Sequence, residues 1–520
     1  MIKQIAKKEF LLNLMTFKFA VGTIVCVVLM AVFMPVLIGD YQERLKSYNE
    51  NVAANEVELR KAKVYKNITP TVYRPPNVLS VFSKGVDEQL DNSEKIDMDQ
   101  SPNIGMTISE TNTLLSVFPV LDVTLIFKIV VSILAMLMAY DVISSEKEQG
   151  TLKLMLSGTI ARHQVLLGKL IAGLMTLLVP VTASFLVGLL VLLLSGVVNL
   201  TGVQWFYIML MYLASLVFAT TMFNLGLFLS CLSKSSATSL VFGLFLWLFL
   251  AALLPNSSAY VASQFGSIDS PDELSGKFQA VTEARRSEIG EATRDIKEDG
   301  SETVSNALGA FGHYYSAFCN KSEMDYRRKV YPVTEPIEIK YGDKLFAVKE
   351  MYMNDLIRQR RLAERIAAVS PIVLYENVMS LLAGTSTGEF RRFRENVRAY
   401  RDEIVSYIRS ETENFTSTTY FTPSKEGDHE RMIEVYYKPF LEAKDKEKKA
   451  ELYKTAVARY EQMMKETPSL NLQGFPKFTY HPSDITDTIR QVLLRLGLLV
   501  VVGFVFFSLS YVAFLRYDVR

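Results

Sequence analysis

Six long apolar stretches alternate with polar segments along the chain. They run for about 18 to 30 residues, and about 20 helical residues are needed to cross about 30 Å of hydrocarbon. The stretches run over residues 19–38, 120–140, 166–195, 204–230, 237–254 and 492–515. The pattern predicts a polytopic α-helical membrane protein with six transmembrane helices.

The first apolar stretch is predicted to stay in the protein as a membrane span. It is too long for a signal peptide, has no small-residue cleavage site in the right place, and continues into the charged, helical segment "DYQERLKSYNE". The eighteen residues before it, 1–18, are amphipathic and basic.

Two long polar segments, residues 39–119 and 256–490, separate the apolar stretches. We expect them to fold together as one α-rich external domain with minor β structure, with helices near 272–298, 345–368 and 445–465. A further helix is predicted from apolar residues that recur every three or four positions opposite an arginine-rich face. These residues are Phe390, Phe393, Val397, Tyr400, Ile404 and Ile408. The stripe is interpreted as a core face; ligand binding by this helix is the alternative.

Composition agrees with a protein that is partly in lipid and partly in water. Hydrophobic side chains make up 49% of the chain and charged ones 21%, with a mean hydropathy of +0.18. The 56 basic and 55 acidic residues nearly cancel, so nothing favours nucleic acid as a partner. Cys26 and Cys231 lie in or beside apolar runs and the four histidines are scattered, so neither a disulfide framework nor a metal site is predicted.

Basic residues flank the apolar stretches mainly on one side, which predicts that this side is cytoplasmic. Arg490 and Arg495 lie on the other side, but long loops are translocated largely regardless of charge, and Asp484 and Asp487 stand nearby. Both termini then lie in the cytoplasm, and the two long polar segments lie outside. The residues concerned include Lys3, Lys7, Lys8, Lys18, Lys147, Lys153, Arg162, Lys169, Lys234 and Arg516.

Catalytic motifs are missing from the sequence. No G-x-x-x-x-G-K-[ST] loop occurs, so this chain is not expected to hydrolyse ATP itself. No Ser/His/Asp order, H-E-x-x-H or G-x-S-x-G is visible, and "GTSTG" at 384–388 is typical of a turn that caps a helix. The chain is therefore predicted not to be an enzyme.

The segment "SSEKEQGTLKLMLS" at residues 144–157 is charged, yet it stands between two apolar stretches. Gly150 permits a turn, and "TLKLML" is predicted to form a short amphipathic helix on the membrane surface. Such a helix suits docking by a soluble partner, and a plain interfacial anchor is the alternative.

The longer stretch "DVISSEKEQGTLKLMLSGTIARHQVLLGKL" closely resembles the intracellular signature of type-2 ABC exporter permeases. The start, "MIKQIAKKEFLLNLMTFKF", resembles the interfacial elbow helix of that family. The segments "VYRPPNVLSVFSKG" and "SPIVLYENVMSLLAGTSTGEFRRFRENVRAY" resemble the subgroup with two large extracytoplasmic insertions, related to gliding-motility and copper-maturation permeases.

The resemblance implies a permease subunit in a bacterial inner membrane. It would work with a second permease chain, identical or homologous, and with a separate cytosolic ABC ATPase subunit that binds ATP and Mg. This chain would bind no cofactor. Residues 141–165 would be the cytosolic coupling segment, with coupling residues Glu146, Glu148, Gly150, Thr151, Leu152, Leu154, Leu156, Arg162 and Lys169. The alternative is an ATP-driven mechanotransmission or envelope-assembly factor that translocates no substrate.

Lys128 places a charge about 12 Å into the second apolar stretch, where an isolated ammonium group is costly. It is expected either to snorkel toward the outer headgroups near Asp122 or to serve a pathway or dimer interface.

Overall fold

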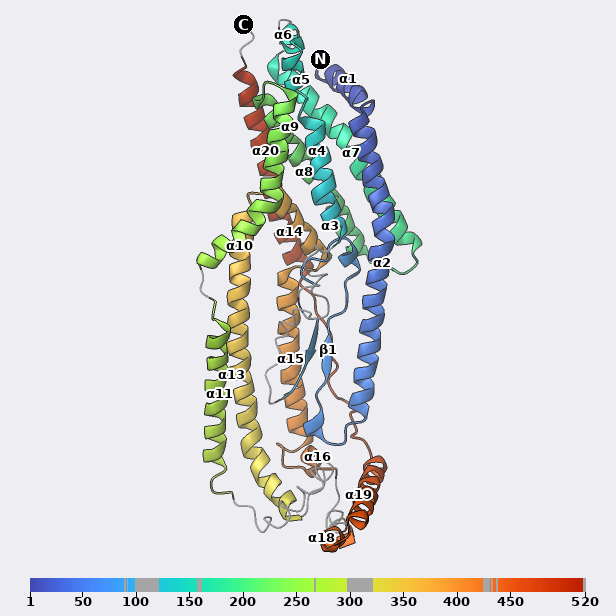
Figure 1. Ribbon diagram of the computed structural model, residues 1–520, viewed down its shortest axis with the longest axis vertical. Coiled ribbons are helices and arrows are strands. Elements are labelled where there is room, and N and C mark those ends of the chain that lie inside the picture. Colours follow the sequence, from blue (N-terminus) through green and yellow to red (C-terminus); the bar gives the residue numbers. More distant parts are fainter. Residues whose placement is uncertain are drawn as a thin grey trace.

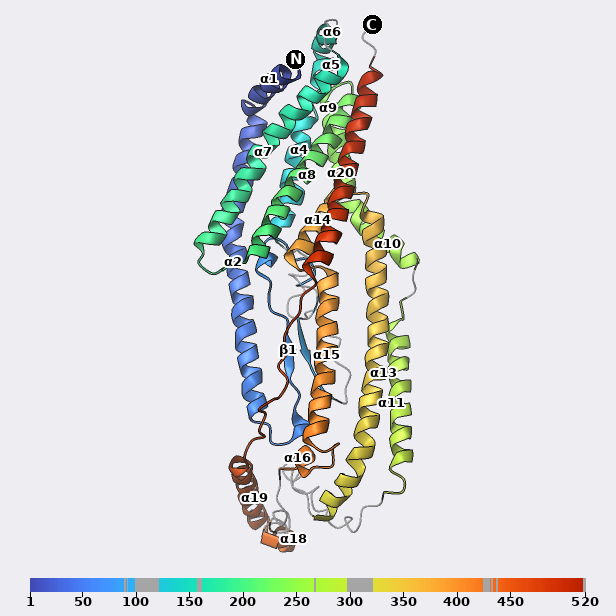
Figure 2. The same ribbon diagram turned by 180° about the vertical axis from the view of Figure 1, so that it is seen from behind.

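A computed structural model describes residues 1–87, 90, 92–98, 121–156, 161–265, 268–296, 321–423, 431, 434–435 and 438–517. The molecule is elongated, with a bundle of apolar helices at one end and a second, mostly helical region, here called the stalk, at the other (Figure 1). Both termini lie at the bundle end, and α18 (Lys438–Glu442) and α19 (Lys446–Glu466) lie at the far end of the stalk, as the reverse view also shows (Figure 2).

The bundle contains the six helices of the described residues that are long and apolar enough to cross a membrane. The sequence prediction of six such helices is confirmed. They are α2 (Phe17–Arg60), the continuous run Val123–Glu148, α7 (Arg162–Leu194), α8 (Gly202–Leu232), the run Ser236–Gln264 and α20 (Ile485–Leu515). The first run comprises α3 (Val123–Ile126), the π-helical turn η5 (Phe127–Val131), α4 (Ser132–Ala139) and α5 (Ser144–Glu148). The second comprises α9 (Ser236–Leu248), η6 (Phe249–Leu253) and α10 (Leu254–Gln264).

Helix α8 is the central helix of the bundle and packs most extensively against α20. Their backbones approach closely at Gly503, where a Cβ atom would lie 2.8 Å from Thr221 Oγ1. The side chain of Asn224 donates to the Gly503 carbonyl oxygen at 3.0 Å. Small residues and interhelical hydrogen bonds hold helices together in lipid, where burial of apolar surface contributes little to association.

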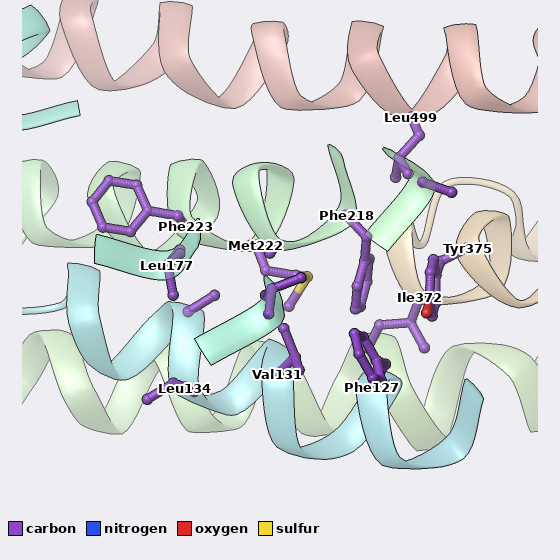
Figure 3. Close-up of a cluster of buried hydrophobic side chains, with 14 of the residues drawn as sticks. Phe127, Val131, Leu134, Leu177, Phe218, Met222, Phe223, Ile372, Tyr375 and Leu499 are labelled. Carbon is purple, nitrogen blue, oxygen red and sulfur yellow. The ribbon is translucent and has the colours of Figure 1, made fainter. Parts of the chain in front are cut away.

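One element of the second long polar segment, α14 (Pro371–Ala383), packs against α8 and α20 of the bundle. Its Tyr375 ring stacks on Phe218 with ring centroids 4.4 Å apart, and its hydroxyl bonds to that of Ser215 at 3.0 Å. Figure 3 shows Tyr375 and Ile372 beside Phe218 and Phe127 in this core. The sequence analysis assigned this segment, as part of residues 256–490, to the external domain. With 13 residues, α14 is too short to span a bilayer by itself.

The stalk is built from helices that run roughly along the long axis of the molecule (Figure 1). Helix α2 has 44 residues and so extends about 66 Å, from the bundle far into the stalk. The other long helices are α11 (Pro271–Ala292), α13 (Lys321–Ala367) and α15 (Thr387–Glu411). Shorter elements are η1 (Tyr65–Asn67), α16 (Thr418–Phe421) and the antiparallel pair β1 (Thr71–Tyr73) and β2 (Ser93–Lys95). The short helix η2 (Val78–Val81) instead packs against α2 and α14 and belongs to the core of the bundle.

The two long polar segments contribute to one hydrophobic cluster in the stalk. Tyr65, Ile68 and Val72 come from the first segment, and Phe393 and Val397 come from α15 in the second. All six apolar residues of the predicted α15 stripe are buried, so its interpretation as a core face is confirmed. This core therefore draws on both segments.

Polar contacts close to this cluster also join the same two segments. Arg401 Nη2 donates to the Met98 carbonyl oxygen at 2.7 Å, and Arg74 Nη2 donates to the Gly384 carbonyl oxygen at 2.7 Å. Gly85 lies so close to Thr385 that a Cβ atom would meet the Thr385 carbonyl oxygen at 2.3 Å.

Candidate coupling site

The segment between the second and third bundle helices forms two short helices, α5 and α6 (Thr151–Leu156), at the bundle end of the molecule (Figure 1). Gly150 joins them with a φ of +73°, in the left-handed region that favours glycine. The backbone N–H groups of Ile143 and Ser144 both donate to Ser230 Oγ of α8 at 3.0 Å. The start of α5 is thereby attached to the bundle.

A buried lysine joins three helices at this site. Lys169 of α7 is only 3% exposed, and its Nζ donates to Glu146 Oε1 of α5 at 2.7 Å and to Glu9 Oε1 of α1 (Ile2–Leu14) at 3.1 Å. Charge-assisted hydrogen bonds of this length are strong, and one buried cation between two carboxylates leaves a net negative charge. Glu146 therefore directs its carboxylate into the protein, although it lies in a charged segment at the end of the bundle.

The end of α5 holds the turn between α8 and α9. Glu148 Oε2 accepts a hydrogen bond from the backbone N–H of Ser236 at 3.1 Å, at the first residue of α9, where a carboxylate is favoured. Lys147 donates to the carbonyl oxygens of Cys231 and Ser233 at the end of α8. Both charged side chains thus satisfy helix-terminal backbone groups within the chain.

Two more contacts attach the ends of this segment to other helices. Arg162, at the start of α7, donates through Nη1 to the Leu515 carbonyl oxygen at 2.5 Å, at the C-terminal end of α20. Lys18, at the start of α2, pairs with Asp141, and its ammonium group lies 4.2 Å from the centroid of the Tyr140 ring.

Helix α6 presents its leucines to different surroundings. Leu152 is fully buried, whereas Leu154 is 77% exposed, because residues two apart on a helix do not share a face. Thr151 is exposed at the start of the helix. The side chain of Leu156 and residues 157–160 lie outside the described part of the chain.

Lys128 has a partner that the sequence did not reveal. Its Nζ lies 3.1 Å from Glu376 Oε2 of α14, and the lysine side chain is 25% exposed. The carboxylate of Asp122 instead accepts hydrogen bonds from the backbone N–H groups of Leu125 at 2.6 Å and Lys84 at 3.1 Å. Lys128 therefore links the second bundle helix to α14.

The sequence analysis did not identify Glu9, Lys18, Asp141 or Ser230 as site residues. Glu9 is the one acidic residue of a basic N-terminal helix, which was a usable signal. Nothing near Ser230 in the sequence marks it. No group of three or more His, Cys, Asp or Glu able to hold a metal ion occurs among the residues that the structure describes.

Six apolar helices and a polar, helical stalk define a multi-pass α-helical membrane protein. The sequence profile of the ABC-2 family transporter proteins matches residues 4–519. The chain therefore belongs to this family, and it is a permease component of an ABC transporter. No curated protein matches the chain in sequence.

Proposed function

We propose that the chain is the permease subunit of an ATP-driven exporter, working as a dimer with an identical or homologous permease chain. Each permease would bind a separate cytosolic ABC ATPase subunit, which holds ATP and Mg. The bundle end with α1, α5 and α6 would face the cytoplasm of a bacterium, and the stalk would stand outside the inner membrane. Family membership and the basic residues near the bundle end support this arrangement.

The observation that carries the proposal is the attachment of α5 to several bundle helices at once. Contacts of Glu146, Lys147 and Glu148, together with Asp141 just before them, reach α2, α7, α8 and α9 directly, and they reach α1 through Lys169, which also binds Glu9. A partner that displaces α5 and α6 would therefore displace the ends of these helices together. Such a connection is what coupling between ATP hydrolysis and helix movement requires.

The docking surface would then centre on α6 and the Gly150 turn. The carboxylates of Glu146 and Glu148 are engaged within the chain, so exposed residues of α6 offer the contact to a partner. Leu154 is the exposed apolar residue there, and burying a leucine side chain contributes about 1.5–3 kcal/mol.

The test is co-purification of the full-length permease with candidate ABC ATPases encoded near its gene. Leu154→Arg is expected to abolish co-purification, while Met351→Arg, which changes an exposed apolar residue of α13 in the stalk, is expected to preserve it. Equal ATPase recovery with both variants, at equal membrane levels, would place the docking surface elsewhere.

A mechanotransmission role is the second candidate. The 44-residue helix α2 favours it, because one uninterrupted helix joins the site near Lys18 to the stalk. ATPase activity that rises when candidate substrates are added would favour export. ATP hydrolysis that no candidate substrate stimulates, but that is accompanied by movement of the stalk, would favour mechanotransmission.

A further inference from the structure

A cleft of about 230 Å³ lies between α13 and α15 in the stalk. Its α15 wall is the arginine-rich face opposite the buried apolar stripe, and its α13 wall includes Phe346 and Ile357. The cleft therefore combines cationic and apolar surface, and its volume suits a small organic ligand or a headgroup.

Two of the three arginines in this cleft have an ion-pair partner within the chain. Arg391 Nε lies 3.1 Å from Glu395 Oε1 on the next turn of α15, and Arg398 Nη1 lies 3.5 Å from Glu350 Oε2 of α13. The remaining acidic residue of the lining, Asp402, is exposed and lies eight residues, or about 12 Å, beyond Arg394 on α15.

Arg394 lies between these two pairs and differs from them. Its guanidinium group stands 5.6 Å from the centroid of the Phe346 ring, which Arg398 also approaches, at 5.3 Å. Unlike Arg391 and Arg398, Arg394 forms no hydrogen bond or ion pair with any residue in the described part of the chain. Desolvation lowers the pKa of Arg394, with Glu94 and Glu350 acting in the opposite direction at longer range. A partly desolvated cation without a bonded anion is costly, and a bound anion would remove that cost.

A second stalk cavity of similar size, about 240 Å³, provides a comparison. It lies between α2 and β1, and both of its arginines are paired. Arg44 Nε lies 3.1 Å from Asp40 Oδ2, and Arg74 Nη1 lies 3.0 Å from Asp87 Oδ1. The two cavities therefore have similar volumes, and both contain arginines. They differ in that both arginines of the second cavity form ion pairs, whereas Arg394 does not.

We propose that the cleft between α13 and α15 binds a ligand oxyanion, a phosphate or carboxylate, at Arg394, with the apolar part of the ligand against Phe346 and Ile357. A guanidinium that packs its face on an aromatic ring keeps its N–H edges available for two parallel hydrogen bonds to such a group. The ion pair between Arg398 of α15 and Glu350 of α13 links the two walls of the site, whereas Arg391 pairs with Glu395 within α15. This proposal does not depend on the ATPase partnership.

The test measures thermal unfolding of the purified full-length chain in phosphatidylcholine nanodiscs at constant ionic strength. The probes are inorganic phosphate, octanoate, and dihexanoyl phosphatidylglycerol below its critical micelle concentration. Because a ligand that binds only the folded state raises its stability, the unfolding midpoint should rise saturably with at least one probe. Arg394→Gln should weaken the apparent affinity at least tenfold.

The control is Arg392→Gln, which removes the same charge from the same helix outside the cleft, at a side chain that is 48% exposed. It should keep the wild-type response. Without ligand, Arg394→Gln should unfold at the wild-type midpoint or above it, because it removes a desolvated charge.

The pattern of responses to the three probes distinguishes a free oxyanion from a lipid headgroup as the source of the anion. A response to phosphate or octanoate supports a free oxyanion, and a response to phosphatidylglycerol alone supports a lipid headgroup. The proposal is overturned if no probe gives a saturable rise, or if the rise is the same in Arg394→Gln.

Discussion

At the scale of single residues, Gly150 and Lys169 carry the candidate coupling site. Gly150 has open space around it, since a Cβ atom there would meet nothing within 4 Å. Glycine is favoured at this position by the backbone conformation alone, a φ of +73°. Lys169 is constrained by its surroundings, because two carboxylates from different helices converge on its buried ammonium group.

Gly150→Val should therefore impair coupling through backbone strain. A residue with a β-carbon in this conformation costs about 1–2 kcal/mol, and asparagine adopts it more readily than valine. We expect Gly150→Val to lose ATPase association or stimulated turnover while Gly150→Asn keeps most of it. Both are measured by co-purification and ATP hydrolysis at matched membrane levels; identical behaviour of the two variants would contradict a role for this backbone conformation.

Lys169→Met should destabilise the bundle end, because it leaves the carboxylates of Glu146 and Glu9 without their cation. Removing one partner of a buried ion pair costs about 3–5 kcal/mol. We expect a lower unfolding midpoint and lower folded yield, and Lys169→Arg should retain more of both. Glu146→Lys should resemble Lys169→Met, because it places a second cation beside Lys169. Wild-type stability of both charge-altering variants would mean that this ion pair contributes little.

At the scale of elements, α14 is a second connection between the bundle and the stalk, beside the long helix α2. It packs against α8 and α20, and α15 follows it after the short turn at Gly384, whose φ is +68°. The ion pair between Lys128 and Glu376 attaches α14 to the second bundle helix. Movement of that helix would therefore reach α15 through α14.

The contribution of the Lys128–Glu376 ion pair to function can be measured by removing the lysine and by exchanging the two charges. Lys128→Leu should insert normally and lose transport or coupled ATP hydrolysis, since the pair is partly exposed and contributes only about 0.2–1 kcal/mol to stability. The double variant Lys128→Glu with Glu376→Lys should recover part of that loss. Full activity of Lys128→Leu would remove the pair from the mechanism, and loss without recovery would assign a role to Lys128 beyond this contact.

At the scale of the whole molecule, the stalk is one folded unit made from two segments far apart in the sequence. Its cluster combines Val72 and Ile96 with Phe393 and Ile404, and Arg401 bonds to a carbonyl oxygen of the first segment. Neither segment contains its own complete core.

Residues 256–490 produced alone should therefore fail to unfold cooperatively, and adding residues 39–119 through a linker should restore a cooperative transition. The measurement is thermal or denaturant unfolding, followed by circular dichroism and by the spectroscopic signals of the tyrosine and phenylalanine side chains. A single sharp transition in the isolated 256–490 segment would show that the first segment is dispensable for the stalk core.

Local sequence pattern was sufficient for the features that depend on one continuous segment. Apolar length predicted six spanning helices, three- and four-residue spacing predicted the buried face of α15, and Gly150 marked a turn. Only the tertiary structure decided which charges meet. Lys128 and Glu376 are 248 residues apart and Lys169 and Glu9 are 160 apart, and no local periodicity encodes pairs at such separations. Likewise, α14 is too short to be recognised as part of the bundle from its own residues, and its position follows from the surfaces that α8 and α20 offer it.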